Sequence, residues 1–198
     1  MNDSYEPGAD IVIAETRAWV ERAVIGLNLC PFAKAPQVKG QVRYVASEAR
    51  DAKALLADLV DELNRLAETP AERVETTLLI LPRVLNDFLD FNDFLDLAEN
   101  AVVDLELDGV IQVASFHPRY LFAGSEVDDV ANSTNRSPHP TLHLLREESI
   151  DRAVAAFPEA EAIFEANIAT LRRLGTEGWA ALQQRCREDA GPGCLGIL

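Results

Sequence analysis

The chain has 198 residues, 48% of them hydrophobic and 26% charged, with a formal net charge of -15. So acidic a chain is a poor partner for nucleic acid, because phosphates are bound mainly by Lys and Arg. No apolar run reaches the roughly 18 residues that cross a bilayer, and the first residues lack a basic and apolar signal pattern. We therefore expect a cytoplasmic protein without a membrane partner, with one domain over residues 1–188 and a flexible tail over 189–198.

Helical and strand periodicities alternate from the start of the chain. Apolar residues at helical spacing predict a helix over 11–27. A proline-rich loop follows, and alternating residues then predict a strand over 41–47. Ser47 is expected to cap a second helix, because leucines recur from Leu55 to Leu66 at spacings of three and four residues.

The apolar run over 76–81, ended by Pro82, predicts a strand at the centre of a sheet. A helix capped by Asn86 or Asp87 comes next, and a third strand is predicted over 110–116. Helices between strands imply right-handed parallel crossovers. The expected fold is therefore α/β, with α+β as the alternative: a single domain with a small, mainly parallel sheet of three to four strands flanked by helices. The expected helical C-terminal part comprises helices over 149–157, 159–174 and 176–187.

Cys30 is the cysteine with a candidate role. The three cysteines are widely spaced, which argues against a disulfide framework or a Cys-rich zinc site. Cys30 lies in an acid-free window over 22–47, where Lys34 would lower the thiol pKa and favour a nucleophile. Its apolar neighbours Leu29 and Phe32 favour a buried, inert thiol instead. Both interpretations stay open.

All three histidines of the chain lie between residues 117 and 143. His117 follows a predicted strand directly, at the end where parallel sheets hold catalytic groups. We expect a general acid or base there; the alternative is a strand-end histidine bonded to a neighbouring carbonyl. A short strand over 141–145 would place His143 beside His117 across a sheet edge.

A metal site is the alternative for these histidines. His139 and His143 are four residues apart, but Pro138 and Pro140 exclude the helical spacing of many zinc sites. A zinc ion held by His117, His143 and an acid, either Asp128 or Asp129, stays open as the alternative, and no other cofactor is predicted.

The segment over 132–140 has too many turn-forming residues for a regular element. Its polar side chains suit a loop that wraps a polar ligand, or a surface loop held by local turns. A second acid-free window, over 130–146, joins the first, so the two could converge on one electropositive pocket for a small anion. The expected substrate-binding residues are Arg119, Tyr120, Asn132, Asn135, Arg136, Ser137, Thr141 and Arg146.

Five segments carry a family resemblance: IGLNLCPFA (25–33), ETTLLILP (75–82), FNDFLDLAE (91–99), VASFHPRYLFAG (113–124) and TNRSPHPTLHLLRE (134–147). Together they resemble the bacterial domain-of-unknown-function family numbered 1415, from about residue 18 to residue 175. The resemblance supplies no established activity, substrate or cofactor. It implies that His139 and Ser133 stand where the family has tyrosine, which makes His139 a poor candidate ligand or base. The family's marked positions coincide with Cys30, Pro31, His117, Tyr120, Asn132, Asn135, Arg136, Ser137, Pro140, Thr141, His143 and Arg146.

The combined expectation is a small cytoplasmic enzyme that acts on an anionic small molecule. His117 would be the general acid or base, assisted by His143, with Cys30 as a candidate nucleophile and arginines holding the anion. The alternatives are a non-catalytic module that binds a metabolite or a protein, a zinc-dependent hydrolase using His117 and His143, and a loop that only stabilises the fold. Substrate, reaction class and oligomeric state stay open.

Overall fold

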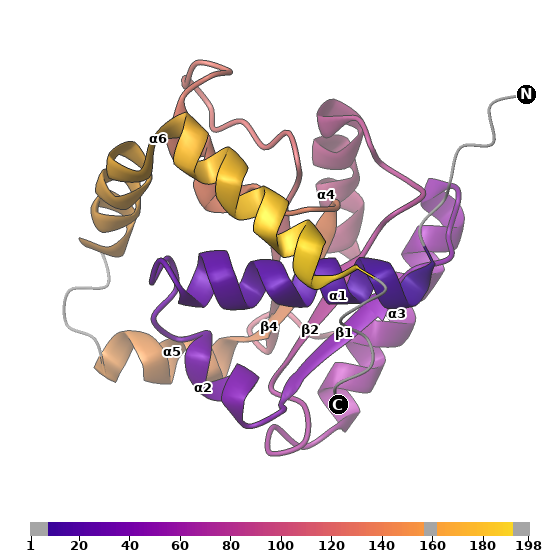
Figure 1. The fold of residues 1–198 in the computed structure, drawn as a ribbon. Coiled ribbons are helices and arrows are strands. Elements are labelled where there is room, and N and C mark those ends of the chain that lie inside the picture. Colours follow the sequence, from indigo (N-terminus) through magenta and orange to yellow (C-terminus); the bar gives the residue numbers. More distant parts are fainter. Residues whose placement is uncertain (1–7, 157–161, 192–198) are drawn as a thin grey trace, which may run out of the picture.

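A computed structural model describes residues 8–156 and 162–191 of the chain (Figure 1). Helices and strands alternate in the order expected from the sequence. The elements are α1 (Ala9–Trp19), η1 (Val20–Ile25, a π-helix), α2 (Lys34–Val38), β1 (Val42–Ala46), α3 (Ala52–Glu68), β2 (Thr76–Ile80), α4 (Phe88–Asp104), β3 (Ile111–Phe116), η2 (Val130–Asn135, a 3-10 helix), β4 (Thr141–Arg146), α5 (Glu147–Ala156) and α6 (Ala162–Asp189).

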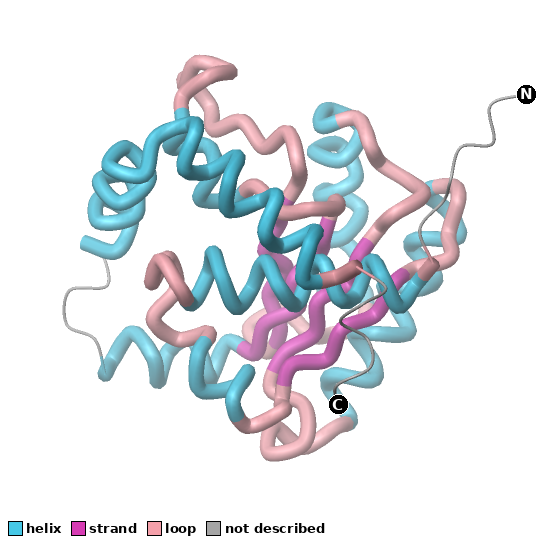
Figure 2. The backbone as a smooth tube through the Cα atoms, in the orientation of Figure 1, coloured by secondary structure: helices cyan, strands magenta, loops and turns pink. Residues whose placement is uncertain are grey.

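The four strands form one sheet in the order β1-β2-β4-β3 (Figure 2). The mixed α/β fold with helices around a single sheet is thereby confirmed, and β2 is central as predicted. The mainly parallel arrangement is wrong, because β4 is antiparallel to both β2 and β3 and only β1 pairs with β2 in parallel. The helical crossovers do give β1, β2 and β3 one direction. The chain then reverses through a long loop, and β4 enters between β2 and β3.

Helices α3 and α4 cover one face of the sheet, behind it in Figure 1. Leu55, Leu59 and Leu63 of α3 are spaced by four residues and fully buried there, together with Phe91 of α4. Complete burial of such a side chain is worth about 1.5–3 kcal/mol. This densely packed layer is the main core of the protein.

The sequence predicted the N-cap residues of α3 and α4, and the structure confirms one of these two predictions. Asp87 caps α4 by accepting from the Leu89 N–H, as predicted. The predicted Ser47 cap is wrong, because α3 begins after Asp51, whose carboxylate accepts from the Ala54 N–H. Ser47 instead accepts from the Ala49 N–H and so shapes the turn before the helix.

Helices α1, η1 and α6 cover the opposite face of the sheet, in front of it in Figure 1. The helix expected over 11–27 is present, but its last turns widen into the π-helix η1. Two C-terminal helices were expected on either side of Gly175. They form the single element α6, broken by a kink at Gly175 with φ 72°.

The remaining expectations concern the ends of elements and the tail. Residues 157–161, which include the end of the helix expected over 149–157, lie outside the described residues. Most of the expected tail, residues 192–198, also lies outside them. Asp189 is the last residue of α6, and Ala190 is buried. Within the described ranges, no helix has the length and apolar character needed to span a membrane.

Candidate binding cavity

A cavity of about 810 Å³ lies between the second face of the sheet and helices α1, η1, α2 and α5. Strand alternation builds its floor, because every second residue points to this face. All four strands contribute to that floor, through Val42, Leu78, Ala114 and Leu145 among others. The helices add a mainly apolar wall that includes Trp19, Val24, Pro36, Ile150 and Ala153.

Cys30 borders this cavity, in the loop between η1 and α2. The loop is held from α6, where the buried Asn167 amide donates to the Leu29 carbonyl at 2.8 Å. Burial raises the pKa of the Cys30 thiol, although the backbone N–H groups of Phe32 and Ala33 act in the opposite direction. The thiol is therefore protonated at neutral pH, which fits the inert interpretation better than the activated nucleophile.

His143 lies in the floor of the same cavity, on β4. Its Nε2 is 2.7 Å from Thr76 Oγ1, and that hydroxyl lies 2.6 Å from the Leu144 carbonyl, to which it donates. Burial lowers the pKa of His143 to about 4. The imidazole is therefore neutral at neutral pH and brings a polar but uncharged group into a mainly apolar space.

Trp19 is a cavity residue that the sequence did not single out. It is 3% exposed, and its indole Nε1 is buried without a hydrogen-bond partner in the described part of the chain. Its ring packs edge-on against Phe116, with centroids 5.2 Å apart. A tryptophan on a helical stripe is typical of the core, and Trp19 is as buried as Trp179, so only its place in the cavity lining distinguishes it.

Charged side chains gather toward the ends of β4 and β2. A guanidinium nitrogen of Arg152, on α5, lies 3.7 Å from a carboxylate oxygen of Glu75, so the positive charge of Arg152 already has an acidic partner. Arg146 borders the cavity, but its guanidinium donates to the carbonyls of Leu66, Thr69 and Val74. Since two of these carbonyls belong to the C-terminal end of α3, Arg146 acts as a helix cap in this arrangement.

His117 lies away from the cavity and is 1% exposed. Its Nδ1 accepts from the Arg119 N–H at 3.0 Å, so its Nε2–H donates to the Leu85 carbonyl at 3.2 Å. The ring packs against Phe88 and Phe91 of α4. Burial lowers the pKa of His117 and keeps it neutral. This geometry matches the carbonyl-bonded strand-end histidine considered from the sequence.

The expected placement of His143 beside His117 is wrong. The β3–β4 register pairs His143 with Ala114, and Thr141 with Phe116. Strand parity therefore puts His143 on the cavity face, while His117 continues the opposite face, toward α4. In the ranges 8–156 and 162–191, no group of three or more His, Cys, Asp or Glu side chains is placed to hold a metal ion.

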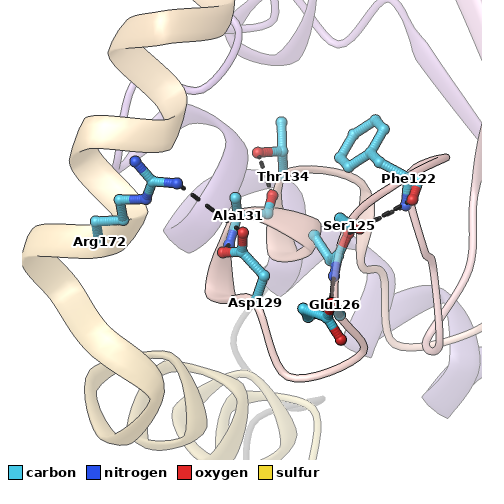
Figure 3. Close-up of polar contacts among 8 residues, drawn as sticks. Phe122, Ser125, Glu126, Asp129, Ala131, Thr134 and Arg172 are labelled. Atoms are coloured by element: carbon cyan, nitrogen blue, oxygen red, sulfur yellow. Dashed lines mark hydrogen bonds and ion pairs between the residues drawn. The ribbon is translucent and has the colours of Figure 1, made fainter.

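The loop between β3 and β4 is held together by its own polar side chains (Figure 3). Asn132 is fully buried; its Oδ1 accepts from the Phe122 N–H and the Ser125 hydroxyl, and its Nδ2 donates to the Glu126 carbonyl. The irregular segment expected here in fact begins with the 3-10 helix η2, capped by Asp129. Arg172 of α6 points at Asp129 from 3.9 Å.

The other expected substrate-binding residues also make contacts within or beside this loop. Arg136 donates to the carbonyls of Tyr120 and Val127, and Asn135 donates to the Ser115 carbonyl. None of these residues borders the cavity, so the structure brings together only Cys30, His143 and Arg146 from the expected set.

The remaining expected residues also contact the protein itself. Ser137 and Thr141 donate to the His139 carbonyl, and Arg119 donates to the Asn86 carbonyl. Tyr120 packs between Phe88 and Phe122.

The two acid-free windows converge only in part, because Lys39 and Arg146 line the cavity whereas Arg22, Arg43 and Arg136 do not. Arg22 pairs with Asp189 of α6, and Arg43 makes two hydrogen bonds to the buried Glu62. Each guanidinium meets a partner of its own, which a count of charges along the sequence does not reveal. His139, expected to be a poor ligand, bonds Glu15 of α1 at 2.6 Å and ties the loop to that helix.

The fold and the site define a mixed α/β protein with a cavity between its sheet and helices α1, η1, α2 and α5. The chain belongs to the family described as "Protein of unknown function (DUF1415)", whose model matches residues 11–181. This confirms the family resemblance seen in the sequence. Neither a curated protein nor a solved structure matches the chain.

Proposed function

We propose that this protein binds a small organic molecule in the cavity between the sheet and helices α1, η1, α2 and α5. The observation that carries the proposal is the cavity itself, about 810 Å³ in a protein whose opposite sheet face is closely packed. Ligand sites generally have volumes of about 300–1,000 Å³, mainly apolar walls and a few polar groups.

The lining favours a ligand with an apolar body. The polar groups near the sheet include the Cys30 thiol, the His143 imidazole and the side chains of Thr76 and Gln112, and burial keeps the thiol and the imidazole uncharged. The anionic ligand expected from the sequence keeps only partial support, because Arg146 and Arg152 already have partners and Lys39 is the other cation of the lining. The cytoplasmic location stays a prediction.

An enzyme is the second candidate, because two of the three expected catalytic residues, Cys30 and His143, border one cavity. The test is the rate at which N-ethylmaleimide labels Cys30, measured by peptide mass spectrometry. A nucleophile would react faster than free cysteine, whereas the raised thiol pKa predicts slower labelling.

General acid or base chemistry at His117 stays a prediction.

A cavity-filling variant tests the binding proposal. Ala114 lies in the floor, so Ala114→Phe would occupy the space that a ligand needs. The matched control is Ala57→Phe, on the exposed side of α3. We expect the uncharged fluorophore N-phenyl-1-naphthylamine to bind the wild type and Ala57→Phe saturably, with one site, and Ala114→Phe at least about tenfold more weakly. Equal binding by both variants, or none by the folded wild type, would contradict the proposal.

A further inference from the structure

We infer that the molecule taken by this cavity is a neutral, ring-containing compound with an O–H or N–H group that donates to Nδ1 of His143. The inference rests on the proposed function, since it names the chemistry of the ligand at that same site. Its basis is a hydrogen-bond chain that joins two residues of the cavity floor, Thr76 and His143, to the backbone carbonyl of Leu144.

The chain fixes which imidazole nitrogen carries the proton. A threonine hydroxyl has one hydrogen, and Thr76 donates it to the Leu144 carbonyl over 2.6 Å. The 2.7 Å contact between Thr76 Oγ1 and His143 Nε2 must then take its hydrogen from the imidazole. Nε2 is therefore protonated, and Nδ1 holds a free lone pair that can only accept.

This acceptor is available to a molecule in the cavity. Among the described residues, the His143 ring has Thr76 as its hydrogen-bond partner. This contact involves Nε2 and leaves Nδ1 without a partner. The His143 side chain is half-buried and belongs to the cavity lining. A ligand that buries Nδ1 without a donor would leave it unsatisfied, at a cost that selects against such ligands.

Aromatic groups beside His143 favour a ring in the ligand. Phe116 packs against His143 with centroids 6.0 Å apart, and Trp19 stands edge-on to Phe116. Ring edges and faces at such separations attract another ring beyond simple area burial.

The charges around the cavity favour a neutral compound. Glu72 and Glu75 are the carboxylates among the described lining residues, and both precede β2. Glu75 is already paired with Arg152, which reduces the attraction that this carboxylate offers to an ammonium group. The low pKa of His143 likewise withholds a positive charge from an anion at the floor, and the lysine of the lining, Lys39, lies outside the sheet, just after α2.

Indole and 1-methylindole provide the test, because they share a ring system and differ in one N–H donor. We expect calorimetry to show indole binding to the wild type about tenfold more tightly, the worth of one hydrogen bond to a buried acceptor. In His143→Leu the ratio should fall to about one. Thr76→Val, which removes the group that orients the imidazole, should reduce it as well. His139→Leu is the control outside the cavity and should keep the wild-type ratio.

Each outcome decides between the inference and the proposed function. Equal affinities of the wild type for both indoles, or a preference that survives in folded His143→Leu, would overturn the inference alone. If neither indole nor the fluorophore binds the folded wild type, the proposed function itself fails.

Discussion

At the scale of single residues, burial decides the charge of the two histidines that the sequence brought forward. His117 is closed in by α4 and has backbone partners at both ring nitrogens. His143 shares its Nε2 with a hydroxyl and borders a cavity. Both pKa values lie below the ordinary histidine value because burial disfavours the imidazolium ion. Two residues of one type thus have different availability to a ligand.

The lowered pKa values of both histidines predict how the stability of the protein depends on pH. Both histidines bind a proton more weakly in the folded protein than in the unfolded chain, where the histidine pKa is about 6.5. Their contribution to the free energy of unfolding is therefore complete above about pH 6.5 and declines as the pH falls toward 4. Urea titrations between pH 7.5 and 5 should show this decline, with a smaller one in His143→Leu. Identical slopes in both proteins would contradict the assignment.

Adjacent threonines on β2 should respond oppositely to one substitution. Thr76→Val removes the hydroxyl that bonds Leu144 and His143, so we expect a loss of about 1–3 kcal/mol in the free energy of unfolding. The Thr77 hydroxyl is buried and lacks a partner in the part of the chain described, so Thr77→Val should gain about 1 kcal/mol. Denaturant unfolding measures both. Equal effects would show that the two hydroxyls are bonded alike.

Residue patterns along the sequence located part of the site and misassigned the rest. Cys30 and His143 stood out as chemically capable residues and both border the cavity. Asn132 and Arg136 stood out for the same reason, yet they hold a loop. A list of hydrogen-bonding groups does not distinguish those that bind a ligand from those that bind the backbone, since either partner satisfies them.

At the scale of elements, the loop between β3 and β4 replaces the helix that a parallel connection would need. Periodicity predicted α3 and α4 well, because their buried faces repeat every three to four residues. The loop has no such period, so nothing local showed that the chain would reverse and insert β4 between β2 and β3.

The stability of this loop should depend on one buried amide. Asn132→Ala removes three hydrogen bonds and leaves the Phe122 N–H without its acceptor, for an expected loss of about 3 kcal/mol. Asn100→Ala, on an exposed position of α4, is the control and should change stability by less than about 0.5 kcal/mol. Thermal unfolding compares the two. Similar melting temperatures would show that the loop does not depend on the Asn132 contacts.

At the scale of the whole molecule, the two faces of the sheet are covered differently. Leucine and phenylalanine side chains of α3 and α4 fill one face, whereas the helices on the other face leave a cavity beside Trp19. Apolar patterning predicts that both faces are covered but not how completely, because packing gaps depend on how helices separated in sequence meet. The cavity was therefore visible only in three dimensions.

Mapping where a small molecule binds tests the central claim most directly. Indole is titrated into isotope-labelled protein, and chemical-shift changes are recorded for backbone amides and methyl groups. We predict the largest changes at Val42, Ala114 and Leu145, in the cavity floor, with little change at Asn132 or Arg136. Changes centred on the loop from Arg119 to Arg136, with none in the cavity floor, would contradict the account.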